Sequence, residues 1–301
     1  MACKLEIKLN NGTILKGWNW HSDHPKVNLV FIPGMAEYAY RFAKMMEYFT
    51  KNGIEVFSID ILGQGLNVSD PKDYECWPKD GFRMHVEAIH KLILLAKENG
   101  LPTVLMGHSM GSLLAQGRME KYPLDVSKTI LVGTNGGQRI SMKMGYIFFK
   151  AFTNKRNWNK PAHKLQALGV NAFSKRIKNR RKKYDWISYN EENVDSFMSD
   201  PQCAHDMTWG FLREFVKGLA KIWDKKEMKK ISKDEKIYIT SGEDDGHGRY
   251  GKGPKWLIKE YKKLGVREVK YKFYPNMRHE IHNEIGKEEV YLDLLNEILS
   301  Y

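Results

Sequence analysis

The stretch G-H-S-M-G at residues 107–111 stands between an apolar run, L-P-T-V-L-M at 101–106, and a segment with helical spacing of its apolar residues, S-L-L-A-Q at 112–116. Strand, tight turn and helix in this order form a nucleophile elbow, which holds a serine at the tip of the turn. Five matching residues alone arise by chance in many loops, but this match also has the strand before it and the helix after it. The helix directs its first N–H groups toward negative charge that forms beside the serine. We therefore predict that Ser109 is a catalytic nucleophile.

Short apolar runs and helical segments alternate along most of the chain. Residues 27–32 and 54–60 have the pattern of buried strands, and residues 81–97 have that of an amphipathic helix. An N-N-G turn at residues 10–12 joins two alternating segments and predicts a leading hairpin. This alternation predicts an α/β fold with an eight-stranded, mostly parallel sheet, helices on both faces and an antiparallel edge.

Strand signals stop between residues 137 and 206, where the sequence is basic and aromatic. The interruption follows the sixth predicted strand, and the alternation resumes after it. We therefore divide the chain into a core, formed by residues 1–136 and 207–301, and an insertion, residues 137–206.

Composition limits the class of protein. Hydrophobic residues make up 42% of the 301 residues, which is enough for a packed core, and no apolar run reaches the length of about 18 residues that a membrane span requires. The first residues lack the apolar segment of a signal peptide, and the three cysteines are far apart, so we expect a reducing, cytoplasmic location. The net charge of +13 is concentrated in residues 139–183, which hold 14 Lys and Arg and no Asp or Glu.

A serine nucleophile needs a base that takes its proton and an acid that orients the base. In folds with this elbow the acid and then the histidine follow the serine along the chain, each after the carboxyl end of a later strand. The loop E-D-D-G-H at residues 243–247 follows the seventh predicted strand, and R-H-E-I-H at residues 278–282 follows the eighth. His247 lies too close to the acidic residues to be held by them, and His282 falls on the turn behind His279. We therefore predict His279 as the base, with the acid in the earlier loop.

Two backbone N–H groups are predicted to bind the oxyanion of a tetrahedral intermediate. One belongs to Met110, directly after the nucleophile, and the other to Met35, in the P-G-M loop after the third strand. The two histidines of H-E-I-H do not have the H-E-x-x-H spacing of a zinc site, so we expect neither a metal nor a cofactor.

Taken in order, these segments resemble the monoacylglycerol lipase and bacterial lysophospholipase branch of the α/β-hydrolases, also catalogued with serine aminopeptidase-like hydrolases. The similar stretches, with the family pattern in parentheses, are residues 31–42 (H-G-x-x-E-H…R-Y), 60–65 (D-x-R-G-H-G), 107–112 (G-H-S-M-G-G/S), 193–201 (a segment leading from cap to core), 241–245 (S-G-x-x-D) and 274–291 (Y-P…R-H-E-x-x-N-E…V-Y). The resemblance implies an α/β-hydrolase fold and places the triad acid on Asp245 rather than Asp244. Four residues depart from the family pattern, namely Pro33, Tyr38, Leu62 and Gln64. These departures concern the shape of the oxyanion loop rather than the triad.

The resemblance also implies that residues 137–206 form a basic, mainly helical cap, or lid, whose inner face defines the substrate. Four apolar or aromatic residues of this segment are predicted to bind substrate: Met142, Tyr146, Phe149 and Trp158. Such side chains suit an acyl-chain tunnel or a surface in contact with lipid. Plain packing between cap and core accounts for them equally well.

The cluster K-R-I-K-N-R-R-K-K at residues 175–183 has three interpretations. It forms a solvated helix face, it attracts the anionic surface of a membrane, or it binds nucleic acid. Nucleic acid is the weakest of the three because no recognition motif accompanies the charge.

Together these observations predict a serine hydrolase that cleaves carboxylic esters of monoacylglycerol- or lysophospholipid-like lipids through an acyl-enzyme on Ser109. Acyl length, headgroup and oligomeric state stay open. A small-ester carboxylesterase and an aminopeptidase-like hydrolase are alternatives with the same chemistry, and a ligand-binding protein on a hydrolase fold is the alternative without it. Contact with an anionic membrane through the basic cap is the interaction expected beyond the substrate.

Overall fold

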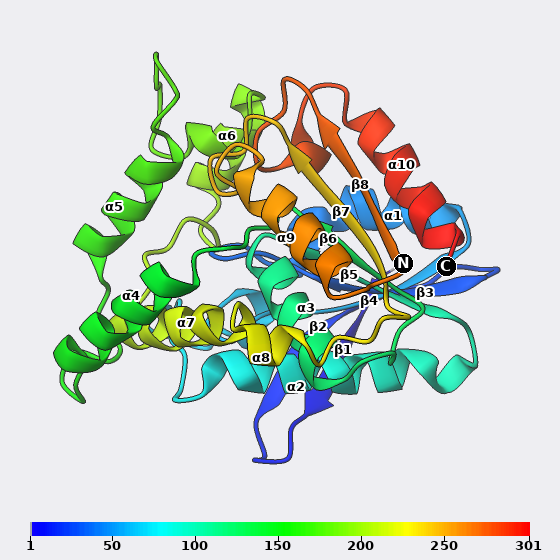
Figure 1. The fold of residues 1–301 in the computed structure, drawn as a ribbon, viewed down its shortest axis with the longest axis horizontal. Coiled ribbons are helices and arrows are strands. Elements are labelled where there is room, and N and C mark those ends of the chain that lie inside the picture. The colour runs from blue at the N-terminus through cyan, green and yellow to red at the C-terminus, as the bar shows by residue number, and fades with distance from the viewer. Residues whose placement is uncertain (1) are drawn as a thin grey trace.

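The computed structural model describes residues 2–301, which contain one sheet of eight strands (Figure 1). The strands are β1 (Ala2–Lys8), β2 (Ile14–Trp20), β3 (Val27–Ile32), β4 (Ile54–Ile59), β5 (Thr103–His108), β6 (Lys128–Val132), β7 (Lys236–Gly242) and β8 (Glu268–Tyr274). Their order in the sheet is β1-β2-β4-β3-β5-β6-β7-β8. β2 pairs antiparallel with both β1 and β4, whereas all other neighbours are parallel. The predicted sheet with its antiparallel edge is therefore confirmed.

Helices cover both faces of the sheet. They are α1 (Ala43–Lys51), α2 (Gly81–Ala96), α3 (Met110–Lys121), α4 (Arg139–Phe152), α5 (His163–Phe173), α6 (Glu191–Ser199), α7 (Trp209–Ile222), α8 (Lys225–Met228), α9 (Lys252–Lys263) and α10 (Lys287–Leu299). Apolar side chains of α2, α3 and α9 belong to one buried cluster, and those of α1 and α10 belong to another. Within β3, Val30 joins the first cluster and Leu29 joins the second, because successive side chains of a strand point to opposite faces. Burial on both faces explains why the central strands are continuous apolar runs.

Five helices, α4 to α8, lie between β6 and β7, where one helix would suffice to connect parallel strands. α7 packs against α4 and also against α2 and α3 of the core. In Figure 1, α4 and α5 form the outer edge of the molecule on the left. A small buried cluster joins Val170 on α5 to Val194 and Phe197 on α6. We call residues 137–206 the cap below.

No helix within residues 2–301 is both long enough and apolar enough to cross a bilayer. The cysteines Cys3, Cys76 and Cys203 are free thiols.

Candidate active site

Ser109 lies at the turn between β5 and α3. Its backbone has φ = +51° and ψ = −118°, which L-residues rarely adopt, and its N–H donates to the Val132 carbonyl at 2.9 Å. The strand and the helix approach closely at this turn, because a Cβ on Gly107 would lie 2.4 Å from the Gly111 backbone. The strand–turn–helix context predicted for the elbow is therefore present.

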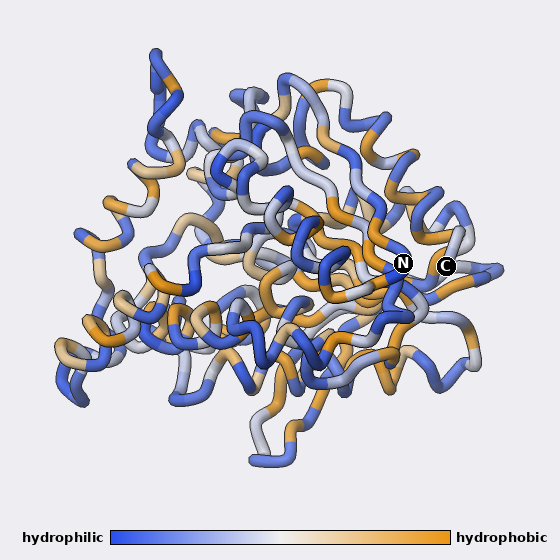
Figure 2. Tube along the Cα trace, viewed as in Figure 1, coloured by the Kyte–Doolittle hydropathy of each residue, from blue (hydrophilic) through white to orange (hydrophobic). Residues whose placement is uncertain are grey.

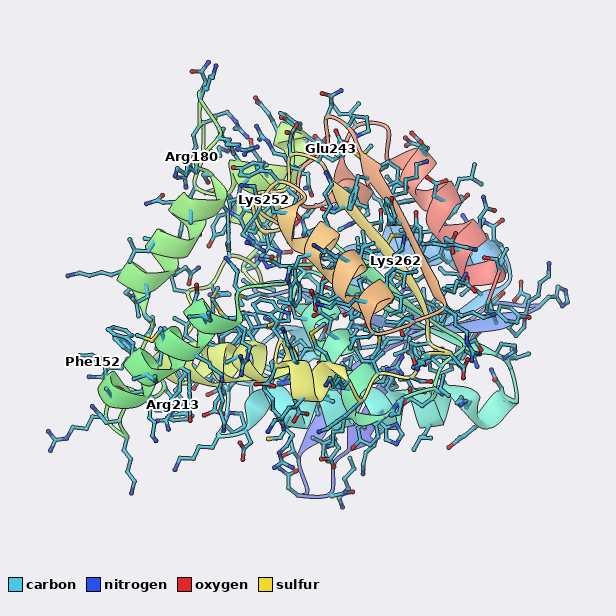
Figure 3. All side chains as sticks on the ribbon, in the orientation of Figure 1. Phe152, Arg180, Arg213, Glu243, Lys252 and Lys262 are labelled. Carbon is cyan, nitrogen blue, oxygen red and sulfur yellow. The ribbon has the colours of Figure 1, made fainter. Side chains whose placement is uncertain are left out.

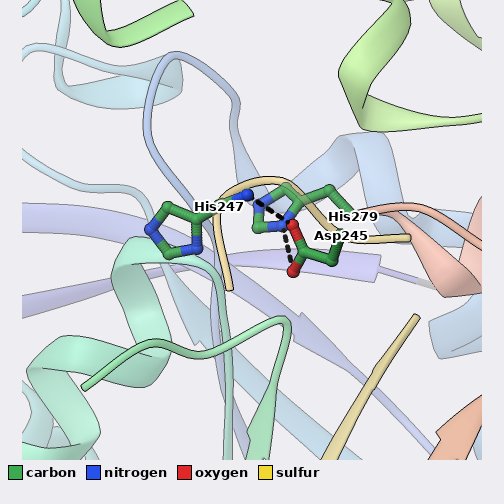
Figure 4. A group of neighbouring side chains, drawn as sticks. All are labelled: Asp245, His247 and His279. Carbon is green, nitrogen blue, oxygen red and sulfur yellow. Dashed lines mark hydrogen bonds and ion pairs between the residues drawn. The ribbon is translucent and has the colours of Figure 1, made fainter. Parts of the chain in front are cut away.

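The Asp245 and His279 side chains meet at the carboxyl edge of the sheet, because one follows β7 and the other follows β8. Nδ1 of His279 lies 3.0 Å from Oδ2 of Asp245, and Oδ1 of Asp245 accepts the backbone N–H of His247 at 2.8 Å (Figure 4). Nε2 of His279 is buried and has no hydrogen-bond partner within residues 2–301. His279 and Ser109 line the same cavity. The structure therefore brings together the three residues predicted as nucleophile, base and acid.

Opposite charges are favoured on the Asp245–His279 pair. Burial by itself would lower the pKa of His279, but the charge of Asp245 and the hydrogen bond to it raise that pKa above its ordinary value. Burial by itself would raise the pKa of Asp245, and the charge of His279 and the same hydrogen bond hold it below its ordinary value. Asp245 therefore stays ionised while His279 takes up a proton, as the acid of a triad must.

The neighbouring acid and histidines take other positions. Asp244 accepts a hydrogen bond from the Tyr189 hydroxyl at 3.0 Å. Burial lowers the pKa of His247 to about 4, so this ring is neutral. His282 packs against the ring of His108 with centroids 4.7 Å apart, and burial lowers its pKa well below the ordinary value. These residues surround the Asp245–His279 pair without replacing either member.

Three side chains of this group have the residue types of a metal site. Possible ligand atoms of Asp245, His247 and His279 lie within 4.8 Å of one another (Figure 4). Both carboxylate oxygens of Asp245, however, already accept hydrogen bonds from N–H groups of these two histidines. This arrangement favours an acid–base role for the group.

The predicted oxyanion donors both line the cavity that contains Ser109. Met110 is the first residue of α3, so its N–H has no partner within the helix. Met35 belongs to the loop after β3. This loop lies against the nucleophile: a Cβ on Gly34, the residue before Met35, would be 3.0 Å from the Cβ of Ser109. The positions of Met35 and Met110 suit the binding of a substrate oxygen between them.

A cavity of about 510 Å³ separates Ser109 from the cap. Its core side includes the elbow, the loop after β3 and His279, and its other walls come from α4, α5, α6, α7 and the segment before α6. Apolar side chains of these helices that line it include Met142, Phe149, Leu165, Leu212, Phe215 and Leu219. A cavity of this size and lining is typical of sites for small apolar ligands.

The four cap residues predicted to bind substrate divide into two pairs. Met142 and Phe149 line the cavity, whereas Tyr146 and Trp158 are not among its lining residues. Trp158 donates its indole N–H to a core carbonyl, that of Trp77, at 2.7 Å, so it attaches the cap to the core. Trp186 also lines the cavity, although no sequence pattern indicated it, and its ring lies 5.0 Å from that of His279.

Three of the four residues that depart from the family pattern make hydrogen bonds, two through side chains and one through the backbone. The Tyr38 hydroxyl donates to Asp200 of the cap at 2.8 Å. Gln64 donates to both carboxylate oxygens of Glu75 at 3.1 Å, and the Leu62 N–H donates to a buried histidine at 3.0 Å. Pro33 directly follows the last residue of β3. At all four of these positions a neutral side chain therefore stands where the family pattern has a basic one.

Glu37, Arg41 and Glu280 lie in the family-like stretches, but no role was predicted for them from the sequence. In the structure the two glutamates are buried, and both accept hydrogen bonds from the Arg41 guanidinium. The available signal was the presence of charged residues beside the apolar runs that lead to the predicted site. The sequence does not show that these charges pair, because Arg41 and Glu280 are more than 200 residues apart in the chain.

A model of the family described as Serine aminopeptidase, S33, matches residues 23–286. The chain belongs to this family. Phospholipase YtpA of Bacillus subtilis is 23% identical over 277 residues, which cover 91% of this chain and 95% of that relative. Monoacylglycerol lipase of Mycolicibacterium smegmatis is 22% identical over 293 residues, which cover 94% of this chain and 91% of that relative.

Solved structures of related chains share the fold. A thermostable carboxyl esterase from Bacillus coagulans matches with a TM-score of 0.88 at 24% identity and covers 99% of this chain and 97% of its own. A soluble variant of monoglyceride lipase from Saccharomyces cerevisiae matches with a TM-score of 0.73 at 19% identity, over 99% and 94%. The α/β-hydrolase fold and the family expected from the sequence are therefore confirmed.

Proposed function

We propose that the protein is a serine hydrolase that cleaves carboxylic esters of single-chain lipids, such as monoacylglycerols or lysophospholipids. The observation that carries this proposal is the apolar cavity of about 510 Å³ lined by both Ser109 and His279. Its cap-side walls suit an acyl chain, while the polar groups at the core side suit the ester carbonyl. The phospholipase and monoacylglycerol lipase relatives support the same substrate class.

The proposed reaction proceeds through an acyl-enzyme on Ser109. Its Oγ attacks the ester carbonyl carbon while Nε2 of His279 takes the hydroxyl proton. The carbonyl oxygen becomes an oxyanion and accepts hydrogen bonds from the N–H groups of Met35 and Met110. Collapse of the intermediate breaks the bond to the alcohol, which leaves with the proton from His279. Water then repeats these steps on the acyl group and releases the fatty acid and free Ser109.

A fluorophosphonate probe and the Ser109→Ala variant test the chemistry. We expect the probe to label the wild-type protein and not the variant, and we expect the variant to lose turnover on the order of a millionfold. Circular dichroism of the variant should be that of the wild type. Hydrolysis by Ser109→Ala near the wild-type rate would refute the mechanism, and an unlabelled wild type would favour a ligand-binding protein.

A substrate panel tests the proposed class. Monoacylglycerols and lysophospholipids with short, medium and long acyl chains should be compared with a soluble acetate ester and an N-terminal aminoacyl anilide. We expect kcat/KM to rise with chain length, because each additional methylene gains apolar contacts in the cavity. A preference for the acetate ester would indicate a small-ester carboxylesterase, and a preference for the anilide would indicate a peptidase.

We further propose that the cap contacts an anionic lipid surface through α4. Five apolar residues on this helix have between 42% and 76% of their surface exposed: Ile140, Met144, Ile147, Phe148 and Phe152. Their spacing places them on one face, and the exposed Lys150, Lys155 and Arg156 flank that face. Leu168 of α5 is 67% exposed and also lines the cavity, so exposed apolar surface reaches the substrate site. Orange segments on the outer edge of α4 and α5 mark this region in Figure 2.

The basic cluster at residues 175–183 is a weaker candidate for this contact. Within it, Arg181 and Lys182 pair with Asp195 at 2.6 and 2.5 Å, and Lys183 pairs with Asp206 at 3.3 Å. Surface pairs of this kind stabilise the fold little, but they reduce the charge on which attraction to a membrane depends. Figure 3 shows Arg180 far from Phe152, at the other end of the cap. We therefore place the lipid contact on α4 and its basic flank.

Flotation with vesicles tests this contact independently of turnover if the Ser109→Ala protein is used. Binding to vesicles that contain phosphatidylglycerol should exceed binding to pure phosphatidylcholine and should weaken with salt, which screens charges over about 8 Å at physiological ionic strength. Replacing Met144, Phe148 and Phe152 with glutamine should abolish it. The control Leu94→Gln, on an exposed leucine of α2, should not. Equal binding to both vesicles would refute the charge contribution, and no binding to either would refute the contact.

A further inference from the structure

A buried guanidinium lies behind the proposed active site. Nη1 of Arg41 lies 3.0 Å from Oε2 of Glu37 and 3.0 Å from Oε1 of Glu280, and Nη2 lies 2.8 Å from Oε2 of Glu280. The Arg41 side chain exposes only 9% of its surface, and the two carboxylates expose 3% and 2%. Buried charges at this depth require partners, and here one cation joins two carboxylates from distant segments.

Glu37 holds the oxyanion loop against the elbow. Its Oε1 accepts the Gly34 N–H at 2.6 Å and lies 2.8 Å from Nδ1 of His108. Gly34 directly precedes the proposed oxyanion donor Met35, and His108 directly precedes Ser109. One carboxylate oxygen therefore fixes the backbone on both sides of the point where the substrate carbonyl would bind.

Glu280 holds the loop that carries the proposed base, because it directly follows His279. Its backbone N–H donates to the Ile187 carbonyl of the cap at 2.7 Å, and its Oε2 accepts from the Asn283 amide at 2.9 Å. Burial by itself would raise the pKa of Glu280, but the charge of Arg41 and the hydrogen bonds to it hold that pKa below the ordinary range. Glu280 is therefore ionised and bound firmly to Arg41.

The cap supplies the remaining partners of the guanidinium. Asn193 on α6 accepts from Nη2 of Arg41 at 2.9 Å and donates to Oε2 of Glu280 at 2.8 Å. The ring of Phe197, also on α6, lies 5.0 Å from the guanidinium carbon. The same Phe197 ring lines the cavity, whereas neither Arg41 nor Asn193 does. The cap thus contacts the machinery through Arg41 at a place that substrate does not reach.

We propose that Arg41 is a positioning residue that couples the cap to the catalytic groups by holding the oxyanion loop, the His279 loop and α6 together. This inference rests on the proposed function, because it assigns the network to that reaction. Its consequence is specific. Loosening α6 should slow the chemical step even for an ester too short to touch the cap.

Steady-state kinetics on a soluble acetate ester test the coupling. Arg41→Lys keeps the charge but loses the planar fork that binds two carboxylates, and we expect kcat to fall about 10²-fold, as small misplacements of reacting groups do. Asn193→Ala should lower kcat about tenfold, because α6 then loses both of the hydrogen bonds through which Asn193 holds Arg41 and Glu280. KM should change little in both variants, because neither side chain lines the cavity.

A matched control separates positioning from stability. Arg118 is also buried and pairs with two carboxylates, those of Asp125 and Glu235, but it is not among the cavity-lining residues. Arg118→Lys should therefore lower thermal stability as Arg41→Lys does and leave kcat within about twofold, because it touches no part of the machinery. An equal loss of kcat in both lysine variants would overturn the inference. So would wild-type kcat in Asn193→Ala.

A pH profile supplies a readout that packing alone would not change. The negative charge of Glu280 raises the pKa of His279, so Glu280→Gln should move the acid limb of kcat/KM to lower pH as well as lower kcat. His108 and His282 also face Glu280, so the profile should be repeated in His282→Asn, where the shift should persist. An unmoved acid limb would overturn the inference. A wild type whose Ser109 is not labelled by fluorophosphonate would instead overturn the proposed function.

Discussion

Glu120 on α3 offers a sharp test of the electrostatics of this fold. It is buried, and its carboxyl makes no hydrogen bond within residues 2–301. Burial raises its pKa to about 10; repulsion from Glu227 adds to this effect, and attraction to Lys230 opposes it. The side chain is therefore protonated in the native state at neutral pH.

The native and unfolded pKa values of Glu120 set the sign of its effect on stability. In the unfolded chain the carboxyl titrates near 4.5, so at higher pH the unfolded state has lost a proton that the native state retains up to about pH 10. The free energy of unfolding therefore falls with rising pH across this window, by about 1.4 kcal/mol per pH unit. The stabilising contribution is complete only below about pH 4.5. From about pH 5.5 to about pH 8 the group accounts for a loss of about 3.4 kcal/mol.

The Glu120→Gln variant removes this titration. Urea unfolding of wild type and variant at about pH 5.5 and about pH 8 gives the difference in free energy of unfolding at each pH. The free energy of unfolding of the variant relative to that of the wild type should be about 3.4 kcal/mol higher at the higher pH than at the lower pH. Any effect of glutamine on packing is the same at both pH values and cancels in this comparison. The exposed Glu98 supplies the control, because Glu98→Gln should show no such movement. A difference that is equal at the two pH values would refute the reasoning.

Three further experiments test the site and its support. Asp245→Asn should lower kcat on the order of 10⁴-fold, because His279 loses the group that sets its tautomer, whereas Asp244→Asn should change kcat little. Both variants are measured on one soluble ester, and the reverse ranking would show that Asp244 is the triad acid. Phe149→Trp fills part of the cavity, so kcat/KM for a long-chain monoacylglycerol should fall about tenfold or more while that for an acetate ester should not; parallel losses would show that the chain binds elsewhere. Lys128→Met removes a buried ammonium that binds the last turn of α10 through four contacts between 2.8 and 3.0 Å, and it should lower the free energy of unfolding by about 3 kcal/mol without altering kcat. Urea unfolding measures that loss, and a change below about 1 kcal/mol would show that these contacts are solvated.

The coupling inferred for Arg41 would also explain why the oxyanion loop tolerates departures from the family pattern. The loop is held from below by Glu37, and it is held from the cap by Tyr38 through Asp200. Glu37 and its partner Arg41 match the family pattern, whereas the contact between Tyr38 and Asp200 uses a residue that departs from it.

The sequence by itself determined the fold and two members of the candidate triad. The central strands appear as apolar runs because both of their faces are buried, and the leading hairpin follows from one N-N-G turn. Ser109 follows from the local pattern of strand, turn and helix. His279 follows from its place after the last strand, because the carboxyl ends of parallel strands meet at one edge of the sheet. These features depend on local conformation and chain order, which the sequence contains directly.

Only the tertiary structure decided which side chains meet. Asp244 and Asp245 are adjacent in the chain, yet one carboxylate contacts the cap and the other contacts His279, because backbone hydrogen bonds set the direction of each side chain. Helical spacing placed Met142 and Tyr146 in one apolar series, but only the packing of α4 against α7 shows which of them lines the cavity. The ion pairs of the basic cluster and the partners of Arg41 could likewise not be predicted from the sequence. Charges that are far apart in the sequence pair only after the chain has folded.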